Sequence, residues 1–222
     1  GWTGGTAQAD RDAVEMALDP GAARRMAGRL AQAGVSTDDE LVVMHVSAGN
    51  PFRRWPEAAF AETAATLAAA GSRRRLVFSS GPSDREAAAR IAAAARERLG
   101  EAARRIIDLG EFDLQELRAL IGRSRLFVGG DTGPLHIAAT TATPVVGIYG
   151  PTLAARSSPW RPADTITISL EQTGLPCRPC DQRACAPGDF RCLTQLMPAA
   201  VIAAAERALA LPPDAPVRGG LC

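Results

Sequence analysis

The chain has 222 residues, of which 46% are hydrophobic and 22% are charged, and its formal net charge is +1. This composition is too apolar and too nearly neutral for an intrinsically disordered chain. It also lacks the basic excess that binding to nucleic acid requires, so nucleic acid is not an expected partner. No run of about 20 apolar residues is present to cross a membrane. The length suffices for one large globular domain, or two small ones, with a hydrophobic core.

Helical and strand patterns alternate along the first hundred residues. Continuous apolar runs at 41–46 and 76–78 are typical of strands buried on both faces of a parallel sheet. Ser83 and Glu86, three positions apart, predict a capping box at the start of a long helix. The elements expected here are a lead-in over 1–20, helices over 21–34, 56–70 and 83–99, and strands over 41–46 and 76–78.

The alternation continues to residue 211. An Asp113-x-x-Glu116 start and one apolar face predict a helix over 113–121, and that face comprises Leu114, Leu117, Leu120 and Ile121. Alternation at this spacing predicts an α/β fold with a doubly wound parallel sheet. The further elements are strands over 105–108, 126–128, 144–149 and 165–170, helices over 133–141 and 197–211, and a flexible tail over 212–222.

Three loops that leave the carboxyl ends of expected strands are rich in Gly, Ser, Thr and Pro, and they cover 47–55, 79–83 and 129–134. Ligands of an open parallel sheet bind beyond the carboxyl ends of its strands, so these loops form the expected binding site. The third loop, Gly-Gly-Asp-Thr-Gly-Pro, runs directly from a strand into a helix. Its glycines permit close approach to a ligand, and the free amides at the helix start favour an anion such as a diphosphate.

Two side chains of this third segment are candidates for ligand contacts. Asp131 would repel phosphate, so we expect it to cap the helix, orient a neighbour or accept a sugar hydroxyl. His136, on the first helical turn, is a candidate donor to a phosphate oxygen. The alternative is an ordinary strand–turn–helix in which Asp131 or Thr132 caps the helix and the backbone satisfies His136.

The first loop carries two adjacent arginines just before a helix. Arg53 and Arg54 can clamp a phosphate through charge-assisted hydrogen bonds, and for Arg53 we favour this role over a solvated turn. Trp55 is expected to anchor the core. In the middle loop, Ser83 and Glu86 are expected to serve the helix start rather than a ribose.

Several enzyme classes are disfavoured because their motifs are missing. The chain has no Lys and therefore no Gly-x-x-x-x-Gly-Lys phosphate loop, and no Gly-x-Gly-x-x-Gly follows an expected strand. These absences argue against a P-loop ATPase and a standard NAD-dependent dehydrogenase. His45 is one of two histidines and lies inside an apolar strand, so we expect a core residue and no Ser–His–Asp triad.

Four of the five cysteines fall in a loop over 176–193, and they are Cys177, Cys180, Cys185 and Cys192. The first pair has the spacing of a metal knuckle, and four thiolates can close a tetrahedral site for zinc or iron. The later spacings match no standard zinc finger. Reduced thiols and one or two disulfides are the alternatives to a structural metal, and catalytic redox use is disfavoured because the pair lies in a Pro-rich loop.

The stretch Asp-Thr-Gly-Pro-Leu-His-Ile-Ala-Ala at 131–139, with Thr-Pro-Val-Val-Gly-Ile-Tyr-Gly-Pro-Thr at 143–152, resembles glycosyltransferase family 9. These are the heptosyltransferases of the lipopolysaccharide core. Arg-Arg-Trp-Pro at 53–56 and Pro-Cys-Arg-Pro-Cys at 176–180 extend the resemblance, which covers about residues 40–210. It implies a Rossmann-like domain that forms the C-terminal, donor-binding half of a GT-B glycosyltransferase.

The resemblance also implies which residues hold the donor, an ADP-sugar such as ADP-heptose. Arg53 takes the position of a phosphate-binding Lys, with the same charge but a bulkier, forked head. Phe112 takes a position that packs against the base. Ala48 replaces the common Ser or Thr and loses one donor. The remaining donor-binding positions are Ser47, Asp131, Thr132, Gly133 and His136.

We therefore expect residues 1–20 to be a linker from an N-terminal domain that this chain lacks, and residues 21–211 to be the donor-binding domain. The resemblance implies inverting transfer of heptose to a lipopolysaccharide-core or related glycan acceptor, with the general base in the missing half and no catalytic residue in this chain. No cofactor is required for that transfer. The implied location is cytoplasmic, with peripheral association at the inner face of the inner membrane left open, as is the oligomeric state.

Two alternatives remain open. The chain could be a degenerate family member that acts as a metal-containing binding or assembly module through its cysteine loop. It could also be another GT-B enzyme or an epimerase that uses a UDP-sugar.

Overall fold

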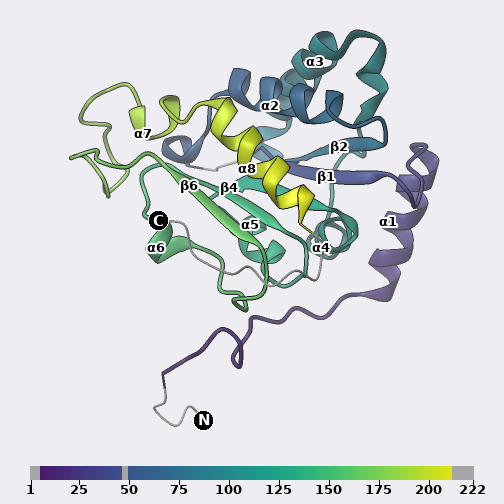
Figure 1. Cartoon of the computed structure of the whole chain (residues 1–222), viewed down its shortest axis with the longest axis horizontal. Coiled ribbons are helices and arrows are strands. Elements are labelled where there is room, and N and C mark those ends of the chain that lie inside the picture. The colour runs from purple at the N-terminus through teal and green to yellow at the C-terminus, as the bar shows by residue number, and fades with distance from the viewer. Residues whose placement is uncertain (1–5, 47–49, 212–222) are drawn as a thin grey trace.

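A six-stranded parallel sheet forms the centre of the molecule (Figure 1), with the strand order β3-β2-β1-β4-β5-β6. The computed structural model describes residues 6–46 and 50–211. The predicted doubly wound, Rossmann-like α/β fold is confirmed by this order, because the chain moves outward from the centre in both directions. The strands are β1 (Glu40–His45), β2 (Arg74–Ser79), β3 (Ile106–Ile107), β4 (Leu126–Gly130), β5 (Val145–Tyr149) and β6 (Thr167–Glu171).

Helices cover both faces of the sheet (Figure 1). One face carries α2 (Glu57–Ala69), α3 (Arg85–Leu99) and α8 (Pro198–Ala210). The other carries α1 (Pro20–Gln32), α4 (Leu114–Arg123) and α5 (Gly133–Ala138). Shorter pieces are α6 (Ala154–Ser157), α7 (Arg191–Thr194) and the 3-10 turns η1 (Pro51–Arg53), η2 (Pro82–Asp84) and η3 (Gly100–Arg105). No helix in the described part of the chain is long and apolar enough to span a membrane.

The apolar runs of the strands supply both layers of core because side chains alternate across a strand. In β1, Val42 and Met44 pack under α2, whereas Leu41 and Val43 pack toward α1 and α4. All four of these side chains are fully buried. Such two-sided burial explains why this strand reads as a continuous apolar run.

Helix starts follow the capping predictions in one case and depart from them in another. The Asp-x-x-Glu start predicted for α4 is confirmed and forms a capping box, with the Asp113 carboxylate accepting from the Glu116 amide at 2.7 Å. The capping box predicted for Ser83 and Glu86 is wrong. Helix α3 begins at Arg85, and the Ser83 hydroxyl instead donates to the Asp84 carboxylate at 3.0 Å. Pro82 starts a short 3-10 turn that shifts the helix start by two residues.

Two further departures concern helix faces and lengths. Leu114, predicted on the buried face of its helix, is 64% exposed because it is the first helical residue and lies at the end of α4. Helix α5 ends at Ala138 rather than at Thr141. At this helix end, the hydroxyls of Thr140 and Thr141 donate to the Ile137 and Ala138 carbonyls, each at 2.8 Å. The short helices α6 and α7 were not predicted from the sequence.

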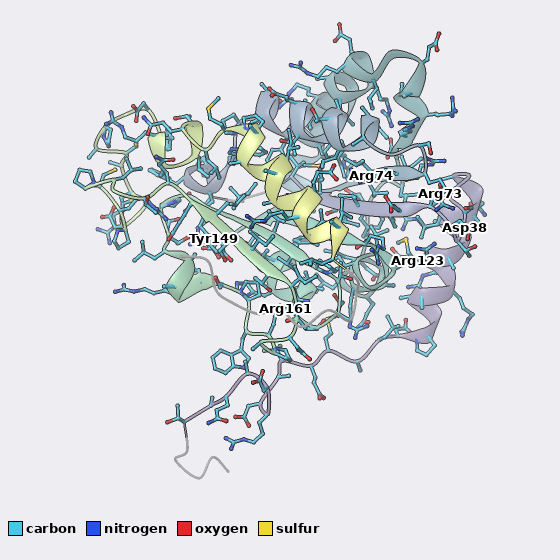
Figure 2. All side chains as sticks on the ribbon, in the orientation of Figure 1. Asp38, Arg73, Arg74, Arg123, Tyr149 and Arg161 are labelled. Carbon is cyan, nitrogen blue, oxygen red and sulfur yellow. The ribbon has the colours of Figure 1, made fainter. Side chains whose placement is uncertain are left out.

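The segment that connects α6 to β6 is held by Arg161 (Figure 2). Its guanidinium donates to the carbonyls of Thr141 and Thr143 at 2.9 and 2.7 Å and to that of Ile166 at 3.2 Å. Burial lowers the pKa of Arg161 to about 10. The lead-in contacts the same region, since Trp160 Nε1 donates to the Asp12 carbonyl at 2.9 Å.

Candidate functional site

The sheet reverses its winding direction between its two central strands. Strands β1 and β4 pair in parallel, with His45 opposite Gly129, and the chain leaves them toward opposite edges of the sheet. The loops that follow such a pair diverge and leave a crevice, which is the usual ligand site of this fold. The ligand loops predicted over 47–55 and 129–134 belong to these two strand ends, although Gly129 and Gly130 are still part of β4.

Two glycines on either side of the loop after β4 differ in the space around them. A Cβ at Gly129 would lie 2.9 Å from the Phe127 ring and 3.2 Å from the His45 Cβ, so only Gly fits. By contrast, a Cβ at Gly133, the first residue of α5, would meet no atom within 4 Å. The fold itself therefore gives no packing reason for Gly133, which leaves open space at the helix start.

Arg53 and Asp131 join the two loops. Arg53 Nη1 donates to the Asp131 backbone carbonyl at 3.0 Å and lies 3.4 Å from the carboxylate Oδ2. The Thr152 hydroxyl, from the loop after β5, donates to that same Oδ2 at 2.7 Å. The Asp131 side chain is only 8% exposed and that of Arg53 is 30% exposed. Among the three roles expected for Asp131, which were to cap the helix, to orient a neighbour or to accept a sugar hydroxyl, this geometry fits the second, with Arg53 as the neighbour.

Electrostatics keep the Asp131 carboxyl ionised. Burial raises the pKa of Asp131, but His136, the Thr152 hydroxyl and the Arg53 charge outweigh burial, so its pKa lies below the usual 3.8. The His136 Nε2 lies 3.9 Å from Oδ1, and its side chain is half exposed. The imidazole therefore stands beside the crevice with one edge open to solvent.

The sequence predicts that the free amides at the start of α5 bind an anion, but the structure of this helix start is less favourable for that role. Thr132 is the N-cap residue, but its side chain makes no capping bond and instead donates to the Gly130 carbonyl at 3.3 Å. The helix has only six residues, so its dipole is weak compared with that of a longer helix. The Arg53 side chain brings a positive charge next to this helix start.

The structure brings most of the predicted donor-binding residues together, and these are Arg53, Asp131, Thr132, Gly133 and His136. Phe112 packs against the core on the α1–α4 side, with the Arg29 guanidinium 4.8 Å from its ring centroid, and its contact with the base stays a prediction. Ser47 and Ala48 lie outside the described residues.

Trp55 and His45, which the sequence predicts to be core residues, are both buried. Trp55 is buried, donates from Nε1 to the Leu196 carbonyl at 2.9 Å and packs edge-on against Phe60. His45 is 4% exposed and lies 3.0 Å from the Ser79 hydroxyl through Nδ1. Burial lowers the pKa of His45 to about 4, so the ring is neutral at pH 7.

Three site residues were missed by sequence reasoning. Thr152 closes the Gly-Pro-Thr of the family-like stretch, so its position could have suggested a role. Asn50 precedes η1 and caps it by accepting from the Phe52 amide at 3.0 Å. Gln182 belongs to the cysteine loop, and its Oε1 accepts from Arg53 Nε at 2.8 Å. No local pattern marks Gln182, because its partner lies 129 positions away.

Two cavities lie at different places in the fold. One, of about 170 Å³, is lined by Arg53, Arg54, Ser83 and Gly130 among others, at the carboxyl ends of the central strands. There Arg54 and Asp84 form an ion pair of 3.0 Å. A larger cavity of about 660 Å³ lies between α1 and α4, away from the crevice.

The four clustered cysteines are free thiols, each partly buried. They all line one cavity of about 200 Å³, which Phe52 and Pro151 close on the side of η1. Thiolates are suitable ligands for zinc or iron. In the described ranges, however, no three Cys, His or acidic side chains come close enough together to hold a metal ion. The metal site at Cys177, Cys180, Cys185 and Cys192 therefore stays a prediction.

Comparisons with known proteins identify the family and the fold of this chain. Residues 9–187 match the model of glycosyltransferase family 9 (heptosyltransferase). Lipopolysaccharide heptosyltransferase 3 of Escherichia coli is 33% identical over 146 residues, 65% of this chain and 41% of that protein. The structure of the E. coli ADP-heptose lipopolysaccharide heptosyltransferase II superposes with a TM-score of 0.69 at 21% identity, covering 88% of this chain and 53% of that one.

The dodecameric iron-containing heptosyltransferase TibC, solved with ADP-D-β-D-heptose, superposes with a TM-score of 0.55 at 16% identity, covering 77% of this chain and 46% of that one. The chain thus spans about half the length of these solved structures and less than half of the curated relative. The family match covers most of the chain. The chain therefore belongs to glycosyltransferase family 9, the family of the heptosyltransferases.

Proposed function

We propose that this chain binds the donor of a heptosyltransferase, an ADP-sugar of the ADP-heptose type, with its diphosphate at Arg53 and His136. The observation that carries the proposal is the orientation of Arg53 at the winding reversal of the sheet. Its Nε and Nη1 are bound by Gln182 and Asp131, whereas Nη2 has no partner among the described residues. An exposed N–H edge of a fixed guanidinium is a suitable donor for a phosphate oxygen.

The neighbouring groups complement this role. His136 stands half exposed beside Asp131, and the open space at Gly133 admits a ligand next to the backbone. Family membership and the ADP-heptose named for two of the similar structures support ADP as the nucleotide. The proposed acceptor is a lipopolysaccharide-core or related glycan, in line with the E. coli relative.

The proposed reaction is an inverting displacement. The acceptor oxygen forms a bond to the anomeric carbon while the bond to the diphosphate breaks, and ADP leaves with the electron pair. A general base takes the hydroxyl proton, and no residue of this chain is proposed for that task. The contribution of this chain is to bind the donor and to stabilise the negative charge that develops on the leaving ADP, through Arg53 and His136.

Thermal unfolding with nucleotides tests this proposal. At a hundredfold excess of ADP over its Kd, the Tm should rise by about 5 °C or more. Arg53→Ala and His136→Ala should abolish the rise, whereas Arg11→Ala, an exposed ion-pair variant in the lead-in, should retain it. An equal rise with UDP would favour the UDP-sugar alternative, and a rise that persists in both site variants would contradict the proposed site.

A metal-containing assembly module is the second candidate function, favoured by the single cavity that the four cysteines share and by the iron named for TibC. The thiols fit zinc or iron in their chemistry, and when bound such a metal would cross-link the loop. Elemental analysis of the purified chain tests this candidate. It predicts about one metal ion per chain, loss of the metal and of assembly in Cys180→Ser, and no dependence of assembly on ADP.

A further inference from the structure

The cysteine loop contacts the candidate donor site at two separate points. Arg178, whose side chain is 5% exposed, donates to the Thr152 carbonyl at 2.6 Å, and Thr152 in turn donates to Asp131. Further along the loop, the Gln182 side chain reaches Arg53. The two members of the Arg53–Asp131 pair are therefore each contacted, directly or through one residue, from the same loop.

Gln182 contacts two residues of the loop after β1. Its Oε1 accepts from Arg53 Nε and from Asn50 Nδ2, each at 2.8 Å. A carbonyl oxygen has two lone pairs, so both bonds form at once. Asn50 caps η1 and Arg53 is its last residue, so the Gln182 amide oxygen binds side chains at both ends of this turn.

The backbone of the cysteine loop is strained where it makes these contacts. Gln182 has φ 60° and Phe190 has φ 50°, and they are the two non-glycine residues with positive φ in the described chain. Both touch η1, because the Phe190 ring packs edge-on against Phe52 with centroids 5.3 Å apart. A non-glycine residue in this conformation is strained and persists where surrounding contacts hold it.

We propose that Gln182 is a positioning residue for donor binding, which fixes the Arg53 guanidinium so that its Nη2 edge faces the donor diphosphate. The inference rests on the proposed function of Arg53. Gln182 binds Nε and Asp131 binds Nη1, which sets the plane of the guanidinium and leaves the remaining edge open. Because the amide of Gln182 is neutral, it orients Arg53 without cancelling the charge that attracts phosphate.

The test measures the Kd of ADP by titration calorimetry in a double-mutant cycle between positions 182 and 53. Gln182→Asn is the main variant, because Asn tolerates positive φ but its amide is one methylene too short to reach Arg53. Arg53→Lys is the second background, because Lys keeps the charge but has a methylene where Arg53 has Nε–H. Arg183→Ala, on the same loop and almost fully exposed, is the matched control.

The proposal predicts that Gln182→Asn weakens ADP binding about fivefold to tenfold in the wild-type background and less than twofold in the Arg53→Lys background. Arg183→Ala should leave the Kd unchanged. An equal loss in both backgrounds would show that Gln182 merely supports the loop and would overturn the proposal. No loss for Gln182→Asn, with binding still dependent on Arg53, would overturn the role of Gln182 alone. Absence of ADP binding by the wild-type chain would overturn the proposed function as well.

Discussion

Arg53 Nη1 donates to the backbone carbonyl of Asp131 at 3.0 Å and lies 3.4 Å from its carboxylate. This pair connects the loop after β1 with the loop after β4, across the point where the sheet reverses its winding. A cation that is oriented by a buried carboxylate, rather than exposed on a mobile side chain, loses little entropy when an anion binds.

Asp131→Asn tests the charge of this pair. The native pKa of Asp131 lies below 3.8, so the carboxylate contributes stability that is fully present above the unfolded-state pKa and is lost as the pH falls through the native one. At pH 7 the variant should therefore be less stable by about 2 kcal/mol. Urea unfolding at pH 7 and again below pH 3.8 measures this difference, which should shrink in acid. A constant difference at both pH values would contradict the role of the charge.

His45→Asn tests a second pH dependence in a different window. Burial lowers the pKa of His45 from 6.5 to about 4, so the unfolded chain takes up a proton before the folded chain does. Stability should therefore fall as the pH drops from 6.5 to about 4, by about 3 kcal/mol in total. Unfolding free energies across this window should lose most of their pH slope in the variant, even if it is less stable throughout. An unchanged slope would show that His45 does not titrate as described.

Two glycine variants separate folding from binding. A Cβ at Gly129 would collide with the Phe127 ring, so Gly129→Ala should destabilise the fold by about 1–3 kcal/mol. A Cβ at Gly133 meets no protein atom, so Gly133→Ala should leave stability unchanged while weakening ADP binding about tenfold. Denaturant unfolding measures the free energy of unfolding of each variant, and calorimetry measures its Kd for ADP. Full ADP affinity in Gly133→Ala would place the donor away from this helix start.

Alkylation of the cysteines tests the state of the loop. All four clustered thiols are free, and burial raises the pKa of Cys192. Because the thiolate is the reactive form, Cys192 should react with iodoacetamide more slowly than Cys177, Cys180 and Cys185 at pH 8. Peptide mass spectrometry measures the rates one cysteine at a time. A disulfide between any two of them, or fastest reaction at Cys192, would contradict the structure.

Local patterns predicted the fold, and they placed the two residues at the centre of the proposed site at one edge of the sheet. The apolar runs that became β1 and β5 are buried on both faces, which only a parallel sheet with helices on each side provides. Arg53 and Asp131 were found because each follows a central strand, and strand ends of a parallel sheet meet at one edge.

Contacts between distant segments could not be predicted in this way. Gln182 reaches Arg53 from a loop whose course depends on packing against η1. The helix start near Ser83 was misplaced because Pro82 and Asp84 form a 3-10 turn that competes with the capping box. The position of Gln182 therefore depends on tertiary contacts, whereas the helix start near Ser83 depends on a competing local turn.

Hydrogen–deuterium exchange with saturating ADP tests the central claim most directly, because it shows where the nucleotide acts on the chain. We expect protection from exchange in peptides covering residues 50–55 and 129–136, which contain Arg53, Asp131 and His136. Unchanged exchange in both segments, or protection confined to the cavity between α1 and α4, would contradict the claim that the donor binds at the winding reversal of the sheet.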